Sequence, residues 1–301
     1  MKKKGEVGGD LRDRRIVLGY AATLLSAVTF AVKGIFAKMI YAHGLDPVTL
    51  LALRFAIAMP LFWAAVIFFP SEKVTAKDVV ILILSGLIGL YGAAILDFYG
   101  LIYVDASIER IILYAYPSIV VVLAAIFFKE RMTIALWASI ALVYVGLAMT
   151  LKVWESVDTG YLFGAGLIFG SAVIYAVSYI ITEVVARRVS AVKITAYTTT
   201  AAAFAFIGTW AGRGAPMPQD PAVWPLIAAL AVISTFIPAL MVSVGIKLLG
   251  ARKAAIAGFI GPAFTALLAY IILNERLTAI QWAGMFVVTI GVILTSRVRR
   301  G

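Results

Sequence analysis

The sequence predicts an all-α integral membrane protein with ten transmembrane helices, arranged as two inverted five-helix repeats. Three observations support this fold class: an apolar composition, ten hydrophobic runs long enough to span a bilayer, and a sequence repeat with a constant offset of 145 residues. Of the 301 residues, 63% are hydrophobic and 14% are charged, whereas soluble domains are roughly half apolar and about one quarter charged. We therefore expect lipid to surround most of the chain.

Ten hydrophobic runs follow one another with short connections. A bilayer core of about 30 Å takes about 20 helical residues for each crossing, and the runs have approximately this length. They occupy residues 16–40, 48–69, 79–103, 107–128, 134–152, 161–186, 194–211, 224–248, 253–273 and 279–296.

Basic residues predict the orientation in the membrane. Lysine and arginine gather in the tail at residues 1–15, in every second connection and at the C-terminus, and they are scarce elsewhere. Because cytoplasmic loops carry an excess of these residues, we expect a multi-pass protein of the cell inner membrane with both termini in the cytoplasm. The net charge of +11 then faces anionic lipid headgroups, so the lipid bilayer and not nucleic acid is the expected partner.

The repeat aligns residues 16–152 with residues 161–296 without a gap. Gly19, Ser26 and Ala27 fall on Gly164, Ser171 and Ala172, and Pro117, Glu130 and Arg131 fall on Pro262, Glu275 and Arg276. Five helices in each half make an odd number, so the second half enters the membrane upside down. Many secondary transporters are built from such inverted repeats and hold their substrate between the halves near the midplane.

Two motifs resemble the signature of the EamA family of the drug/metabolite transporter superfamily. They are Pro117-Ser118-Ile119 with Phe128-Lys129-Glu130-Arg131-Met132-Thr133 and Gly146, and Gly261-Pro262 with Leu273-Asn274-Glu275-Arg276-Leu277-Thr278 and Gly291. Lys33 and Arg54 also stand where many members carry Lys and Arg. The resemblance implies ten helices in two inverted repeats, alternating access, and mostly export of amino acids or other metabolites. The membrane-embedded Glu with which small four-helix relatives bind cations is missing from the first helix, so that coupling scheme does not carry over.

Five ionisable residues fall inside predicted helices of the first half, all towards its outer side: Lys33, Arg54, Asp97, Glu109 and Arg110. Such groups are costly in hydrocarbon, by about 2.5–3.5 kcal/mol each, and usually face a cavity or a partner. We expect Lys33, Arg54 and Asp97 to line the substrate cavity. An amino acid would place its carboxylate towards Lys33 or Arg54 and its ammonium group towards Asp97. The alternative is a set of internal ion pairs, or side chains that snorkel to the interface.

Further candidates follow from the equivalence of the first and sixth helices. Tyr175, Ser178 and Tyr179 form one predicted stripe along the cavity, and Phe30 is the equivalent of Tyr175 in the first helix. Tyr91 and Tyr114 are additional candidates. An aromatic residue in such a chain also serves as packing or as interfacial belt. Three prolines, Pro117, Pro238 and Pro262, are expected to break helices and take part in gating, or else to make simple packing kinks.

No catalytic motif, metal-ligand spacing or cofactor motif is present, and the chain has no cysteine. The first functional prediction is therefore a secondary transporter, not an enzyme, that exports an amino acid or a related small metabolite, as a monomer or homodimer. One alternative is uptake or exchange of an organic ion or nucleotide-sugar-like metabolite. A second alternative is a receptor or assembly factor that transports nothing.

Overall fold

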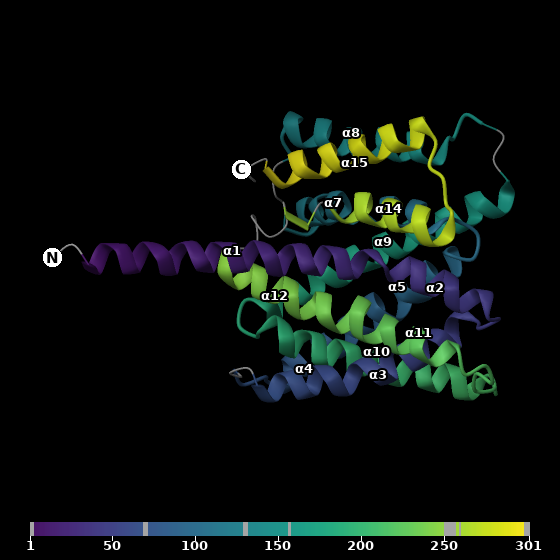
Figure 1. Cartoon of the computed structure of the whole chain (residues 1–301), viewed down its shortest axis with the longest axis horizontal. Coiled ribbons are helices and arrows are strands. Elements are labelled where there is room, and N and C mark those ends of the chain that lie inside the picture. The colour runs from purple at the N-terminus through teal and green to yellow at the C-terminus, as the bar shows by residue number, and fades with distance from the viewer. Residues whose placement is uncertain are drawn as a thin grey trace.

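The computed structural model describes residues 3–68, 72–128, 132–155, 158–249, 257–258 and 260–297. Every regular element in these ranges is a helix, and no strand occurs in them. Helix α1 (Lys3–Ala31) begins and helix α15 (Ala279–Arg297) ends at the same end of the bundle (Figure 1). We call this end the terminal end. The opposite end, with the connections at residues 43–46, 101–105 and 213–222, is the distal end.

In the first half, three of the five expected runs are interrupted helices. The elements after α1 are α2 (Lys33–Ala42), α3 (Pro47–Phe68), α4 (Ala76–Ser85), the π-helix η1 (Gly86–Gly92), α5 (Ala93–Gly100), α6 (Ala106–Leu113), α7 (Tyr116–Phe128) and α8 (Ile134–Leu151). Helix α1 extends back into the tail predicted at residues 1–15. It also ends before Lys33, which the sequence analysis did not anticipate.

The second half repeats this order in part, because its first helix is continuous where α1 and α2 are separate. It contains α9 (Thr159–Ala186), α10 (Ala191–Gly212), α11 (Val223–Ala231), the π-helix η2 (Val232–Phe236), α12 (Ile237–Leu249), α14 (Gly261–Leu273) and α15. The first residues of the run expected at 253–273 lie outside the described residues. The Glu130–Arg131 pair of the first motif also lies outside them.

Seven helical stretches are long and apolar enough to cross a membrane by length and composition. The apolar helices Gly261–Leu273 and Ala279–Thr295 are shorter. Helix α10 has 22 residues, but it carries Lys193 and a run of threonines and is not one of the seven. The described helices are thus those of a multi-pass membrane protein, with seven spans identified in this way.

Interruptions occur at equivalent points of the two halves. The offset of 145 residues places η1 on residues 231–237, almost the range of η2, and it places Tyr116, where α7 begins, on Gly261, where α14 begins. Pro117, Pro238 and Pro262 are each the second residue of a helix that follows such an interruption. Proline suits this position because a first-turn N–H has no partner within the helix. The prediction that these prolines mark helix interruptions agrees with the helix bounds, and their part in gating stays a prediction.

Helix pairing also follows the offset. Helix α3 packs on α10 and α8 packs on α15, so equivalent helices of the two halves meet. Helix α1 packs on α12 and α14, and its equivalent α9 packs on the stretch α4–η1–α5 and on α7. These contacts therefore have counterparts in the two halves.

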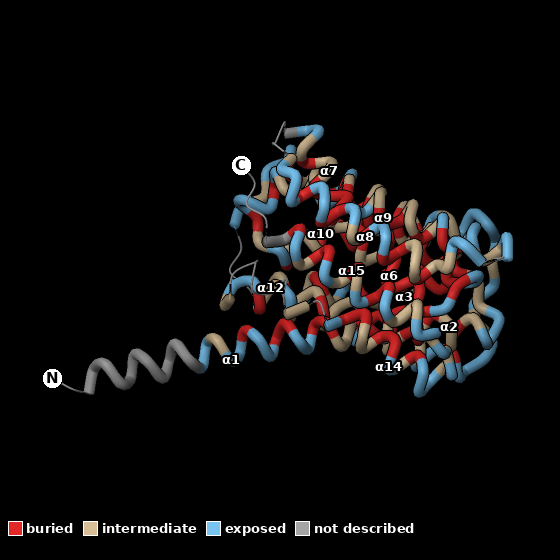
Figure 2. Tube along the Cα trace, turned by 90° about the horizontal axis from the view of Figure 1, so that it is seen from above, coloured by how far each residue is buried: buried red, intermediate tan, exposed pale blue. Residues whose placement is uncertain are grey.

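Burial is uneven along the bundle. The largest cluster of buried apolar side chains joins both halves in the distal part, and it includes Ile35, Leu51, Phe98, Phe206 and Ile227. Towards the terminal end the buried clusters are smaller and separate. Figure 2 shows buried residues concentrated in the body of the bundle beyond α1, away from the terminal end. The two halves are therefore sealed together mainly in the distal part.

Glycines permit a close helix contact between α8 and α15. A methyl group on Gly146 would lie 2.6 Å from Val288 N and 2.8 Å from Gly284 O. We expect Gly146→Ala to lower the melting temperature of the purified protein by several degrees, because the two backbones must separate. Gly208 of α10 meets nothing within 4 Å, so the control Gly208→Ala should be neutral or slightly stabilising. Equal melting temperatures for the two variants would contradict this account of the contact.

Candidate functional site

All five ionisable residues singled out in the sequence are buried in the structure. Their exposed fractions are 4% for Lys33, 6% for Arg54, 5% for Asp97, 1% for Glu109 and 4% for Arg110. They come from α2, α3, α5 and α6, next to the distal core. Arg110 thus does not reach towards the headgroups, which was one alternative for it. We call these five residues the charge cluster.

Lys33 is the centre of the charge cluster. Its Nζ donates to Asp97 Oδ2 at 2.5 Å and to Glu109 Oε1 at 2.7 Å. The chain between α1 and α2 is interrupted at Val32, so Lys33 is the first residue of a new helix. The carbonyl of Ala31 is freed by this interruption and accepts a hydrogen bond from Thr265 Oγ1 at 3.0 Å. One ammonium group is therefore shared by two carboxylates from two other helices.

The two arginines have aromatic and hydroxyl partners. Arg54 Nε donates to Thr235 Oγ1 in η2 at 2.8 Å, across the boundary between the halves. Its guanidinium carbon lies 5.1 Å from the ring centres of both Phe55 and Phe98. Within the described part of the chain, no carboxylate lies within 4.0 Å of it. Such cation–π contacts replace part of the lost hydration of a buried cation.

Arg110, like Arg54, contacts two aromatic rings. Its guanidinium carbon lies 4.3 Å from the ring centre of Phe30 and 5.2 Å from that of Tyr114. Phe30 also lies 5.7 Å from Lys33 Nζ, so its ring contacts both cations. Tyr114 Oη donates to the carbonyl of Gly258 at 2.9 Å, which brings the second half to this place. Phe30 and Tyr114 thus belong to the surroundings of the charge cluster, and their contact with a substrate stays a prediction.

Three polar atoms of the charge cluster are buried without a hydrogen-bond partner among the described residues: Asp97 Oδ1, Glu109 Oε2 and Arg110 Nε. A buried polar atom left unpaired costs about 1–3 kcal/mol, and more when the group is charged. The cluster therefore offers two acceptors and one donor to a ligand.

Tyr175 and Tyr179 mark where the interior becomes accessible. They lie on the same face of α9 as Ile168 and Ala172, since residues at these spacings share one side of a helix. Ile168 and Ala172 are fully buried, whereas Tyr175 is 41% and Tyr179 is 53% exposed. Because α9 runs from the distal end to the terminal end, its inward face is covered distally and uncovered towards the terminal end.

Two other predicted residues make different contacts. The hydroxyl of Ser178 lies 2.8 Å from Ser85 Oγ and faces the stretch α4–η1, where it packs closely on Gly89. Tyr91 hydrogen-bonds Thr209 at 2.8 Å, and its ring packs on Phe206 at 4.6 Å. Both therefore have their contacts in helix packing and not at the charge cluster.

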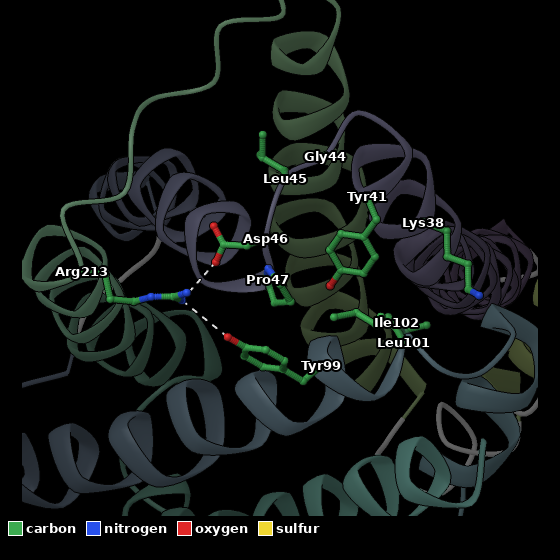
Figure 3. Close-up of a pocket in the computed structure, with 10 residues that line it drawn as sticks. All are labelled: Lys38, Tyr41, Gly44, Leu45, Asp46, Pro47, Tyr99, Leu101, Ile102 and Arg213. Carbon is green, nitrogen blue, oxygen red and sulfur yellow. Dashed lines mark hydrogen bonds and ion pairs between the residues drawn. The ribbon is translucent and has the colours of Figure 1, made fainter. Parts of the chain in front are cut away.

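A surface pocket of about 510 Å³ lies at the distal end, and it contains none of the predicted site residues. Figure 3 shows its wall, in which Arg213 points to Asp46 and Tyr99. Tyr41 and Leu101 also line it, and Tyr41 Oη donates to the carbonyl of Phe98 at 2.8 Å. Phe98 contacts both Lys33 and Arg54. A thin layer of side chains thus separates the pocket from the charge cluster.

Glu275 of the second motif fastens the distal ends of the two halves. Its carboxylate accepts hydrogen bonds from the backbone N–H groups of Ala106 and Ser107, at 2.9 and 3.1 Å, and from Ser107 Oγ at 2.8 Å. A carboxylate at this place caps the first turn of α6 and complements the helix dipole. Burial and the charge of Glu275 raise the pKa of nearby Asp105, while Lys38 lowers it. Glu275 therefore caps a helix of the other half.

Several contributors were not foreseen from the sequence. Phe98 and Thr235 hold Arg54, and Thr265 satisfies the interrupted first helix. Of these three residues, only Phe98 could have been singled out from the sequence, because it directly follows Asp97, an acid within an apolar run. The two threonines are indistinguishable in sequence from the many threonines that bond their own helix backbone, such as Thr198 and Thr289.

The contact between Lys33 and Asp97 can be measured by a double-mutant cycle. We expect Lys33→Met and Asp97→Asn to show a coupling free energy of about 1–3 kcal/mol in the unfolding of the purified protein, because the groups are buried and in contact. The pair Lys38 and Asp105 is the control, since these groups are 4.0 Å apart and 24% and 52% exposed. Its coupling should not exceed about 0.5 kcal/mol. Equal couplings in the two cycles would contradict a buried ion pair at Lys33.

Comparison with known proteins identifies the family. The sequence model of the EamA-like transporter family matches residues 17–152 and again residues 162–297. The uncharacterized transporter YcbK of Bacillus subtilis is 30% identical over 92% of this chain and 93% of its own length. An uncharacterized transporter of Archaeoglobus fulgidus is 25% identical over 93% and 96%, respectively. A solved crystal structure with 18% identity shares the fold, with a TM-score of 0.67 over 94% of this chain and 98% of that chain. The chain therefore belongs to the EamA-like transporter family, with two EamA domains covering nearly all of it.

Proposed function

We propose that the protein is a secondary transporter that moves a small metabolite across the cell inner membrane by alternating access. In this proposal ten helices form two inverted five-helix repeats, at residues 16–152 and 161–296, and both termini are cytoplasmic. The observation that carries the proposal is the charge cluster, which lies between a sealed distal part and an interior face uncovered towards the terminal end. Charges in such a place meet a substrate that enters from one side at a time.

The path that we propose for the substrate follows side chains from the distal pocket, past the charge cluster, to Tyr175. The distal pocket is separated from the charge cluster by Tyr41, Phe98 and Leu101. Tyr114 lies beside Arg110 of the cluster. Two residues further along the chain, the ring of Tyr116 packs on that of Tyr175, with the ring centres 5.3 Å apart. A substrate released to the distal side would have to displace the thin layer at Phe98. We propose that this layer is the outer gate and that the present structure faces the cytoplasm.

The substrate that we propose is an amino acid or a related compound, and the proposed direction is export. The support for both is the family resemblance together with a cluster of mixed charge bordered by aromatic side chains, which suits a zwitterion with an apolar body. Uptake or exchange of an organic ion is the second candidate. The related proteins named above are described only as transporters, so they do not choose between the two.

Transport is tested with the purified protein in two steps. Thermal-shift screening against an amino-acid and metabolite library should reveal a ligand that raises the melting temperature, because a ligand that binds only the folded state stabilises it. The labelled ligand should then exchange into proteoliposomes loaded with unlabelled ligand, and Asp97→Asn should reduce the rate. Liposomes without protein are the control. Stabilisation by a ligand that never crosses the membrane would favour a receptor.

Orientation and gate position can be tested together, because the chain has no cysteine to interfere with labelling. With a membrane-impermeant thiol reagent, Tyr179→Cys should react only from the cytoplasmic side, since this position is exposed towards the terminal end. Gln219→Cys in the distal connection should react only from outside. Ile227→Cys, at a fully buried position of the distal core, should react from neither side. The opposite sidedness of the first two variants would overturn the proposed orientation.

A further inference from the structure

We infer that Arg110, together with the first turn of α14, binds the carboxylate of the substrate. This inference rests on the proposed function and names the chemistry by which the site selects its ligand. It differs from the expectation based on sequence, in which Lys33 or Arg54 met the carboxylate.

Lys33 is the least available of the three cations. Its ammonium group already bonds two carboxylates, at 2.5 and 2.7 Å. The buried cluster holds three cations and two carboxylates, so one positive charge is left over. Buried charge without a counter-ion is expensive. The excess must therefore reside on Arg54 or Arg110, and a monoanionic group would neutralise it.

Arg110 has the more available guanidinium. Arg54 Nε is engaged by Thr235, whereas Arg110 Nε has no hydrogen-bond partner among the described residues although Arg110 is only 4% exposed. The rings of Phe30 and Tyr114 lie against the guanidinium, and the Tyr114 hydroxyl bonds to Arg110, but Nε is left without a partner among the described residues. Arginine presents its N–H groups in the plane as a fork that matches a carboxylate.

A second positive group faces the same place. Arg110 Nη2 lies 3.1 Å from where a methyl group on Gly261 would be, so it is next to the first residue of α14. This helix has 13 residues. Pro262 in its first turn has no N–H and Phe264 N donates to Ile260 O at 3.1 Å, so the helix dipole, and not a row of free N–H groups, makes this end positive. A cation and a positive helix end repel each other unless an anion lies between them. Interrupted membrane helices whose N-termini point at anionic substrate groups are a known arrangement in transporters.

The place is reached from the uncovered side of the bundle. Phe30, Tyr114 and Gly258 around Arg110 are partly exposed, and Ile260 at the start of α14 is 41% exposed. Asp97 Oδ1 and Glu109 Oε2 remain as acceptors for an ammonium group of the same ligand. The carboxylate would therefore lie at α14, with the remainder of the ligand towards Tyr175.

The test uses acetate as the carboxylate probe, acetamide as its neutral isostere and inorganic phosphate as the other anion. Melting temperature is followed against probe concentration at constant ionic strength. Acetate should stabilise the wild type and acetamide should not. Arg110→Gln should weaken the apparent acetate affinity at least about tenfold, and Arg110→Lys should give an intermediate value, because it keeps the charge and loses the fork. Arg213→Gln, at the distal surface, is the matched control and should behave as the wild type.

Three results would overturn the inference. Arg110→Gln and Arg110→Lys could keep the wild-type acetate response, Arg54→Gln alone could abolish it, or phosphate alone could stabilise the protein in an Arg110-dependent way. Because the readout is binding, failure here is separate from failure of the proposed function. A wild type that transports, with an acetate response independent of Arg110, would overturn only the inference. A wild type with an Arg110-dependent acetate response that transports nothing would overturn only the function.

Discussion

One ammonium group holds the polar interior of this protein together. Lys33 bonds Asp97 of α5 and Glu109 of α6 at once, and it stands at the start of α2 because the first helix is interrupted one residue earlier. In apolar surroundings, losing one partner leaves an uncompensated charge, which costs about 3–5 kcal/mol. The relative positions of α2, α5 and α6 are fixed by this requirement. Arg54 and Arg110 take no part in these ion pairs, and their guanidinium groups contact aromatic rings instead.

The interruptions are confined to particular helices. Helices α3, α8, α10 and α15 are continuous, and they form the two pairs in which equivalent helices of the halves pack together. Two contacts beyond the ends of α3 and α10 also join the halves: His43 Nδ1 lies 2.7 Å from Asp220 Oδ2 distally, and Asp78 of α4 forms an ion pair with Arg188 towards the terminal end. The interrupted helices lie between these two continuous pairs. Irregular backbone in a membrane is tolerated where it is enclosed by protein, which is the arrangement seen here.

Much of the architecture is encoded in local sequence signals. Apart from the start of α1 at Lys3, the hydrophobic runs predict the bounds of the fully described helices to within a few residues. The offset of 145 residues predicts that Pro117 and Pro262 lie at equivalent interruptions. Proline alone is an incomplete signal, since Pro60 lies within the uninterrupted α3. The interruption at Val32 has no proline or glycine at that residue, and the π-helices depend on packing that no short segment specifies. These features arise from contacts between distant segments.

The sequence identifies the charged residues of the candidate site, but it does not show which of them are in contact. Charges in apolar runs identify Lys33, Arg54, Asp97, Glu109 and Arg110, because such residues must find partners. Depth along a helix does not determine which way a side chain faces. For that reason the sequence could not show that Glu109 shares Lys33 with Asp97, nor that Tyr91 packs in the core against Phe206.

Through Glu275, the separation of the two halves at the distal end is coupled to hydration. In the sealed arrangement its carboxylate satisfies the first N–H groups of α6 without water. If the halves separate distally, these groups and the carboxylate all need hydration, so opening takes up water. Solutes that are excluded from protein surfaces, such as sucrose, disfavour exposure of that kind. Separation of the halves at the distal end is therefore coupled, through Glu275, to the water activity on that side.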